Sequence, residues 1–150
     1  MKRIVAVLLL FLAPALSVAE EGYPEVCSQV YGAAADAADA AVSRDTKSIA
    51  AMKKVVAPRT SIAKLPPELG ELLRSLNDIV DEAFGTLPVD RLTYPVHRAE
   101  ICVRRLRGKP VPDNFKAVQP KLLECSKKPE KLAIPCAMEL AGSSQANEDA

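Results

Sequence analysis

The sequence has few aromatic residues and little of what enzyme chemistry requires. Only 4% of its 150 residues are aromatic, tryptophan is absent, and His97 is the single histidine. A nucleophile–base pair would need a serine or free cysteine beside His97, and no Gly-x-Ser-x-Gly motif is present. The chain also has no glycine-rich phosphate loop, haem-attachment motif or EF-hand loop. We therefore predict that the protein is not an enzyme and takes no cofactor.

A long apolar run that could anchor the mature chain is also lacking. Met1–Ala19 has a charged start at Lys2 and Arg3, a short apolar stretch and small residues before Glu20, which is the pattern of a secretory signal peptide. The apolar stretch is shorter than the roughly 20 residues that span a bilayer. We expect cleavage before Glu20, a periplasmic or secreted protein, and no stable membrane insertion after cleavage.

The mature chain has almost no net charge. Removing residues 1–19 leaves 131 residues with 18 basic and 19 acidic side chains, because two of the twenty basic residues belong to the signal peptide. The resulting net charge of −1 does not favour any class of charged partner, and the length suits a single domain. We divide the chain into the signal peptide 1–19, a helical bundle 20–108, a proline-rich helical extension 109–141 packed on the bundle, and a disordered tail 142–150.

Four cysteines lie in the mature part, at Cys27, Cys102, Cys125 and Cys136. An exported chain meets an oxidising compartment, so two disulfides are expected. Of the three possible pairings we favour Cys27–Cys102 with Cys125–Cys136, because the second pair is close in sequence across a turn that contains proline. A metal site would need a Cys-x-x-Cys motif or more histidines, so we expect no metal.

Apolar residues recur at steps of three and four over about residues 24–44, 49–56, 67–84 and 95–106. This periodicity predicts an all-α fold, a compact bundle of about four helices, in which Cys102 faces the core. After Gly108, five prolines divide the chain, which predicts short helical pieces around Phe115–Val118, Lys121–Cys125 and Cys136–Leu140. We expect these pieces to form a short disulfide-stapled C-terminal subregion.

A basic run is the most noticeable chemical feature. It comprises Arg91, His97, Arg98, Arg104, Arg105, Arg107 and Lys109, against only Asp90 and Glu100. The simplest interpretation is a solvated helix face; the alternatives are a site for an acidic protein, or for nucleic acid or lipid headgroups. Few aromatic residues are present for base stacking, so we expect no nucleic-acid partner. If the run is functional, Arg98, Arg104, Arg105 and Arg107 are the predicted partner-binding residues.

Two carboxylates and the histidine are the candidates for catalysis. Asp78 and Glu82 are four residues apart on the third predicted helix, and the pattern indicates that they lie on its polar side. Paired catalytic carboxylates are usually held in a cleft, so we interpret both residues, and His97, as structural. A deep pocket that joined His97 to carboxylates would reopen the enzyme hypothesis.

Several segments of the chain form a pattern seen in other proteins: Cys27–Tyr31, Ala34–Ala38, Arg44-Asp45, Ile79–Phe84 and the helix that bears Cys102. In these segments the chain resembles a class of small uncharacterised exported helical proteins of Gram-negative bacteria. In size, signal, helicity and cysteine use the chain is also similar to periplasmic immunity proteins against toxins delivered by type VI secretion. The resemblance implies a helical fold and an exported location. Independently of it, we expect another exported or envelope protein as the partner.

We therefore expect a non-enzymatic exported binding protein, an inhibitor or immunity-like protein that docks through a helical face. The alternative is a periplasmic structural or stress-related, chaperone-like protein whose apolar surface becomes available when the fold loosens.

Overall fold

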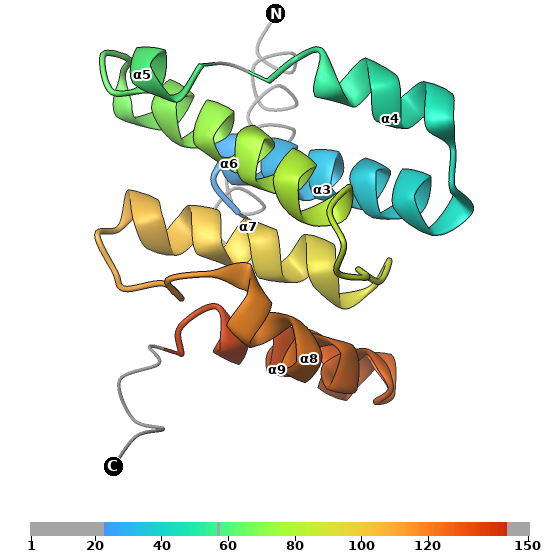
Figure 1. Ribbon diagram of the computed structural model, residues 1–150. Helices are drawn as coiled ribbons and strands as arrows, with labels where there is room; N and C mark the ends of the chain where they lie inside the picture. The colour runs from blue at the N-terminus through green and yellow to red at the C-terminus, as the bar shows by residue number, and fades with distance from the viewer. Residues whose placement is uncertain (1–22, 57, 144–150) are drawn as a thin grey trace, which may run out of the picture.

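The computed structural model describes residues 23–56 and 58–143, and this part of the chain is helical without strands (Figure 1). The predicted all-α fold is confirmed. The predicted signal peptide, 1–19, and residues 144–150 of the predicted tail lie outside the described residues. Within the described ranges, none of the helices combines the length and the apolar character needed to cross a membrane.

Three long helices form the centre of the fold. Helix α3 (Glu25–Ser43) packs against both α6 (Pro67–Ala83) and α7 (Thr93–Leu106), which also contact each other (Figure 1). Because α3 is rich in alanine, its neighbours can approach its backbone closely, and little aromatic volume is needed between the helices. Apolar residues of the predicted stripes, among them Val30, Ile79 and Cys102, lie in the core between these helices.

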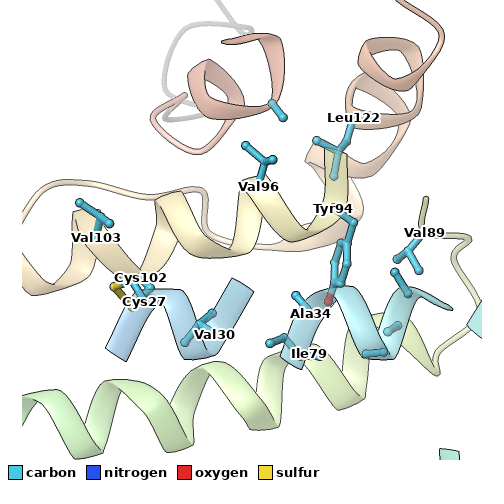
Figure 2. Close-up of a cluster of buried hydrophobic side chains, with 14 residues drawn as sticks. Cys27, Val30, Ala34, Ile79, Val89, Tyr94, Val96, Cys102, Val103 and Leu122 are labelled. Atoms are coloured by element: carbon cyan, nitrogen blue, oxygen red, sulfur yellow. A yellow bond between two sulfur atoms is a disulfide. The ribbon is translucent and has the colours of Figure 1, made fainter. Parts of the chain in front are cut away.

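The main core lies where these helices converge (Figure 2). Val30 and Ala34 of α3 and Ile79 of α6 are fully buried there. Tyr94 of α7 is also fully buried, and its ring meets that of Phe115 edge-on with centroids 5.6 Å apart. This aromatic pair lies where α7 meets the C-terminal part of the chain.

The segment between α3 and α6 is held less firmly. Helix α3 is followed by Arg44, which adopts a left-handed conformation with φ of 55° and ends the helix. The side chain of the next residue, Asp45, accepts hydrogen bonds from two backbone N–H groups and so caps the start of α4 (Thr46–Lys53). Helix α4 ends before Pro58, as predicted, but buries no residue completely. The single-turn helix α5 (Arg59–Ile62) leads into α6.

Helix α7 begins at Thr93, slightly earlier than the predicted start near Pro95. The carboxylate of Asp90 accepts hydrogen bonds from the backbone N–H groups of Leu92 and Thr93, at 2.9 and 2.6 Å, and from the Thr93 hydroxyl. These bonds satisfy N–H groups that the first turn of a helix leaves without partners. Pro95 therefore lies within the first turn, where a proline is tolerated.

Beyond α7 the chain forms a hairpin of α8 (Phe115–Ser126) and α9 (Glu130–Leu140), which packs on α7 on the side away from α6 (Figure 1). The prediction of short pieces divided by prolines is wrong, because Pro120 and Pro135 lie inside these helices. Each proline removes one backbone hydrogen bond. Both prolines are exposed, and the opposite faces of their helices are buried, so packing and the disulfide offset that loss.

Both predicted disulfides are present, and the cysteine pairing is confirmed. Cys27 of α3 is bonded to Cys102 of α7, with Cα atoms 5.6 Å apart, and Cys102 faces the core as expected. Cys125 and Cys136 join α8 to α9, with Cα atoms 5.7 Å apart. No cysteine remains free. One bond therefore closes the bundle across 75 residues of sequence and the other closes the hairpin across 11.

Candidate functional site

Helix α6 carries a polar face that is turned inward. Glu71, Ser75, Asp78 and Glu82 are separated by four, three and four residues, so they lie along one side of the helix. The Glu71 side chain is 5% exposed and Ser75 is fully buried, while those of Asp78 and Glu82 are 17% and 14% exposed. The face that the sequence assigned to solvent is therefore covered by protein.

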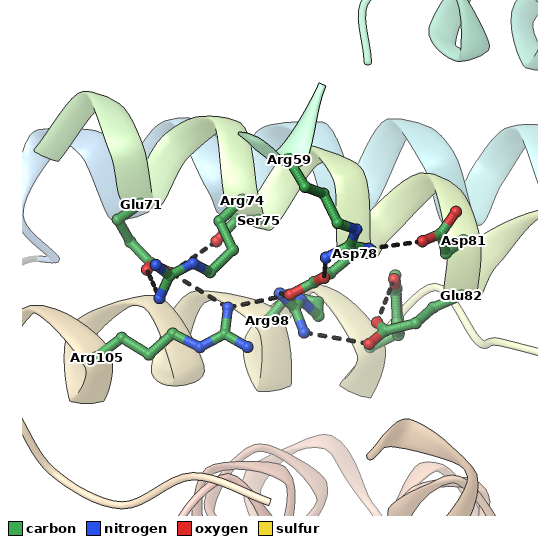
Figure 3. Close-up of polar contacts among 10 residues, drawn as sticks. Arg59, Glu71, Arg74, Ser75, Asp78, Asp81, Glu82, Arg98 and Arg105 are labelled. Carbon is green, nitrogen blue, oxygen red and sulfur yellow. Dashed lines mark hydrogen bonds and ion pairs between the residues drawn. The ribbon is translucent and has the colours of Figure 1, made fainter. Parts of the chain in front are cut away.

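Helix α7 covers this face with two arginines (Figure 3). Arg98 donates hydrogen bonds to Glu82 Oε1 at 3.2 Å and to Asp78 Oδ2 at 3.3 Å, and its side chain is 2% exposed. Arg105, two helical turns later, donates to Asp78 Oδ2 at 3.0 Å and lies 3.5 Å from Glu71 Oε1. Because a seven-residue step returns to the same side of a helix, both guanidinium groups face α6.

Further donors complete the network at its edges. Arg59 of α5 reaches Asp78 at 3.5 Å and the exposed Asp81 at 2.8 Å, and the Tyr94 hydroxyl donates to Glu82 Oε2 at 2.9 Å. Buried charges are costly unless they are paired and hydrogen-bonded. The pairs therefore fix the register between α6 and α7, and link α5 to α6.

Burial changes the acidity of these groups. Removal from water raises the pKa of Glu82 above 4.5, although the charge on Arg98 opposes this shift. The pKa of Tyr94 is raised well above 10.0, first by burial and then by the Glu82 charge. Burial lowers the pKa of Arg98, but the nearby Glu82, Tyr94 and Asp78 outweigh that effect and raise its pKa above the ordinary value of a guanidinium group. Arg98 is therefore a permanent cation inside the protein.

A cavity of about 250 Å³ opens beside this network, between α6, α7 and residues 112–115. Its lining includes Asp78, Glu82, His97, Arg98 and the exposed Asp113. His97 is 1% exposed and its Nδ1 lies 3.4 Å from the Ala137 carbonyl oxygen. Burial, reinforced by the neighbouring Arg98, lowers the His97 pKa to about 4, so the imidazole is neutral near pH 7.

The predicted partner-binding arginines are in very different environments. Arg98 is buried, so its interpretation as part of a solvated face is wrong; the reason is that α6 supplies carboxylates in register with it. Arg105 and Arg104 are 22% and 25% exposed, Arg105 paired with α6 and Arg104 lying 3.8 Å from Glu100. Only Arg107, after the end of α7, is exposed. The four do not form one surface.

Sequence reasoning missed Glu71, Ser75 and Tyr94 as members of the network. A signal was present, because the acidic and hydroxyl residues of α6 repeat at helical spacing and the two arginines of α7 are seven residues apart. Matching these spacings between two helices would have indicated that the polar faces meet. The acid residues that line the cavity at its edge, Asp81 and Asp113, carry no such signal.

No protein-family model matches this chain, and neither the curated proteins nor the solved structures include a significant match. The resemblances described from the sequence therefore remain predictions, and the function has to be argued from the geometry.

Proposed function

We propose that this chain is an exported, non-enzymatic binding protein that docks on another envelope protein, as an inhibitor or immunity-like protein does. The observation that carries the proposal is the network of buried ion pairs between α6 and α7, which holds a polar cavity in a preformed shape beside the surface. A site that is fixed before binding loses less conformational entropy when a partner docks. Two disulfides add rigidity and suit an exported location.

The charges of the cavity favour a basic partner group. Four carboxylates and two guanidinium groups line it: Asp78, Asp81, Glu82, Asp113, Arg98 and Arg105. With His97 neutral, the lining has a formal charge of −2, and Arg59 offsets part of this from outside. Since Asp81 and Asp113 are exposed, the negative charge reaches the surface. This differs from the basic run, for which the alternative to a solvated helix face was a site for an acidic protein.

An enzymatic role has less support, although the cavity does join His97 to carboxylates. Asp78 and Glu82 are both engaged by Arg98. The described lining contains no serine, threonine, cysteine or lysine that could act as a nucleophile. Binding therefore explains the arrangement with fewer additional assumptions than catalysis.

The test is affinity capture from the native periplasm with charge-reversed surface variants. An Asp81→Lys, Asp113→Lys variant should fail to retain a partner that the unchanged chain retains in stoichiometric amount. The matched control, Asp36→Lys with Glu139→Lys, reverses two exposed carboxylates outside the cavity and should retain it. Equal capture by both variants would contradict docking at this edge. All these changes are at exposed side chains, where ion pairs contribute little to stability.

A second candidate, a chaperone-like stress protein, is favoured by one observation. Helix α4 has no buried residue, and Val55 and Val56 beyond it are 62% and 38% exposed. Regions with few buried contacts open at low free energy. The protection of the amides against hydrogen exchange should then be low across residues 46–56 and fall further under mild acid, with a parallel gain in binding of an unfolded client. Protection of α4 equal to that of α7 would remove this candidate.

A further inference from the structure

We propose that the segment between α3 and α6, residues 46–65, binds reversibly to an anionic lipid surface through its lysines and its exposed valines. The ligand is an array of phosphate-bearing headgroups, such as those of phosphatidylglycerol. None of these residues lines the cavity between α6, α7 and residues 112–115. Lipid binding is therefore independent of the partner docking proposed there, and additional to it.

The charge of this segment differs from that of the chain as a whole. Basic and acidic residues are almost equal in number over the full sequence, but residues 46–67 contain five basic residues and no aspartate or glutamate. The five are Lys47, Lys53, Lys54, Arg59 and Lys64. Arg59 is paired with Asp78 and Asp81. The four lysines are exposed and form no ion pair or side-chain hydrogen bond with the described residues, so their charge is available to a partner.

The nearest carboxylates do not cancel this charge. Asp36, Asp39 and Asp45 line the groove between α3 and α4. Asp39 is paired with Arg91 at 2.7 Å, and the exposed Arg44 adds a cation beside Asp45. An excess of positive charge therefore remains on this side of the described chain, and an anionic surface attracts such an excess within about a Debye length.

Exposed apolar side chains accompany the lysines. Val55 and Val56 directly follow Lys53 and Lys54 and are 62% and 38% exposed. Cations next to exposed apolar residues are typical of segments that lie at a lipid interface. The lysine stems can lie along the apolar layer there while the ammonium groups stay among the headgroups. Two valines supply only a shallow apolar contact, so the binding is reversible adsorption.

The fold presents this segment on one side of the molecule. Helices α4 and α5 lie over α3 and α6, on the side away from α7 (Figure 1). Lys47 and Lys54 are seven residues apart, so they share one side of α4 and its last turn. The half-buried Ile49 and Met52 are on the opposite side of this helix. The two lysines therefore point away from the bundle.

A lipid surface fits these features better than an acidic protein does. Strong contacts between proteins are concentrated at tryptophan, tyrosine and arginine residues that fill pockets. Residues 46–65 contain no aromatic residue, and their one arginine is already paired. Lysines are point charges on flexible stems and impose little geometry on a partner. An array of headgroups requires no more than this.

The test is co-sedimentation of the mature chain, with both disulfides intact, with lipid vesicles. Vesicles of equal parts phosphatidylcholine and phosphatidylglycerol should bind the protein at least about tenfold more tightly than vesicles of phosphatidylcholine alone. Raising the ionic strength from about 0.01 M to about 0.15 M shortens the Debye length from about 30 Å to about 8 Å, so the affinity should fall about tenfold or more. Equal binding to both kinds of vesicle would overturn the proposal.

Two charge-matched variants locate the surface. Lys53→Gln with Lys54→Gln should weaken binding about thirtyfold, since each lysine near an anionic surface contributes about fivefold. Lys128→Gln with Lys131→Gln removes the same charge at exposed positions of the α8–α9 hairpin and should weaken it less than about twofold. None of the four lysines has a side-chain partner in the described chain, so all variants should fold. Equal losses in both variants would contradict binding through residues 46–65.

The valines distinguish a lipid surface from an acidic protein. Val55→Ala removes two carbon atoms of an exposed side chain and should weaken vesicle binding about fivefold without changing its salt dependence. Soluble polyglutamate that binds as tightly as the vesicles, and is insensitive to Val55→Ala, would assign the surface to an acidic protein and overturn the lipid proposal.

Amide hydrogen exchange provides a second measurement of the site. On anionic vesicles the amides of residues 46–56 should gain protection, while those of α8 and α9 stay unchanged. Failure to bind anionic vesicles at low ionic strength would overturn the lipid proposal. Because no partner protein is present, that result would leave the capture experiment to decide the proposed function.

Discussion

Replacing Arg98 by methionine should destabilise the protein strongly. The Arg98 side chain is 2% exposed and is the only cation hydrogen-bonded to Glu82 in the described chain. Asp78 keeps Arg59 and Arg105 as partners, so the uncompensated charge in the variant lies mainly on Glu82, which retains the Tyr94 hydroxyl. Removing one member of a buried pair costs about 3–5 kcal/mol. We expect a loss of this size in the free energy of unfolding at pH 7.

The loss should depend on pH in a defined direction. Burial already raises the pKa of Glu82 above 4.5, and removing Arg98 takes away a charge that lowers it. A carboxyl with a raised folded-state pKa binds its proton more tightly in the folded protein, so its charged form destabilises the fold at pH above that value. As the pH falls toward 4.5, Glu82 becomes protonated and the cost of Arg98→Met should shrink.

The assay is urea unfolding of the disulfide-intact protein at pH 7 and at pH 5, compared with the unchanged chain at each pH. Arg91→Met is the matched control, because Arg91 also makes two side-chain hydrogen bonds but is 54% exposed; it should cost less than about 1 kcal/mol. The double variant Arg98→Met, Glu82→Gln should recover part of the loss. A cost for Arg98→Met below about 1 kcal/mol, or one that does not change with pH, would refute the reasoning.

Three further predictions concern other parts of the fold. The pKa of His97 falls from 6.5 to about 4 on folding. The stability that this shift contributes above pH 6.5 is therefore lost as the pH falls through 4, by about 3 kcal/mol. His97→Gln should flatten this part of a urea-unfolding pH profile, and an unchanged slope would contradict the assigned pKa shift. Cys125→Ser with Cys136→Ser should cost about 3 kcal/mol and speed amide exchange in α8 and α9 but not in α3; uniform acceleration would show that the hairpin is not a separate unit. Gly85→Ala would bring a Cβ within 2.6 Å of the Asp81 carbonyl oxygen and should lower stability by about 1–3 kcal/mol. Gly32→Ala on α3, where the added Cβ would meet nothing within 4 Å, should raise stability by about 0.5–1 kcal/mol. Shifts of the calorimetric Tm in the same direction for both variants would contradict the packing argument.

The central helices and the cysteine pairing were predictable, because local patterns specify them. The apolar residues of α3, α6 and α7 repeat at helical spacing, and Cys27 and Cys102 lie within two of these stripes. The hairpin was mispredicted for the opposite reason. Proline is disfavoured inside a helix on local grounds, and the burial that offsets it at Pro120 and Pro135 depends on contacts with a distant helix.

The candidate site could not be read from the sequence for a related reason. A pattern of polar residues on a helix face indicates where water is usually found, but Asp78 and Glu82 show that a polar face can instead be buried by charges of opposite sign. A carboxylate can be satisfied either by water or by a buried cation, and only the position of the neighbouring helix decides which of the two applies. The same ambiguity hid Arg98, whose surroundings are supplied by residues 16 and 20 positions earlier in the chain.

The bond between Cys27 and Cys102 also determines how the molecule would respond to mechanical tension. If the chain is pulled at its two ends, force passes from the start of α3 directly across this bond into α7, and residues 28–101 carry none of it. The second bond shields residues 126–135 in the same way. The closed loop contains α6 and most of α7, so the ion pairs of Arg98 with Asp78 and Glu82 lie in a part of the chain that tension cannot extend while the bond is intact. Arg105, after Cys102, lies outside this loop. Only the residues before Cys27, and those after Cys102 that lie outside the hairpin loop, can lengthen, and extension by force should stop well short of the full contour length until a reductant is added.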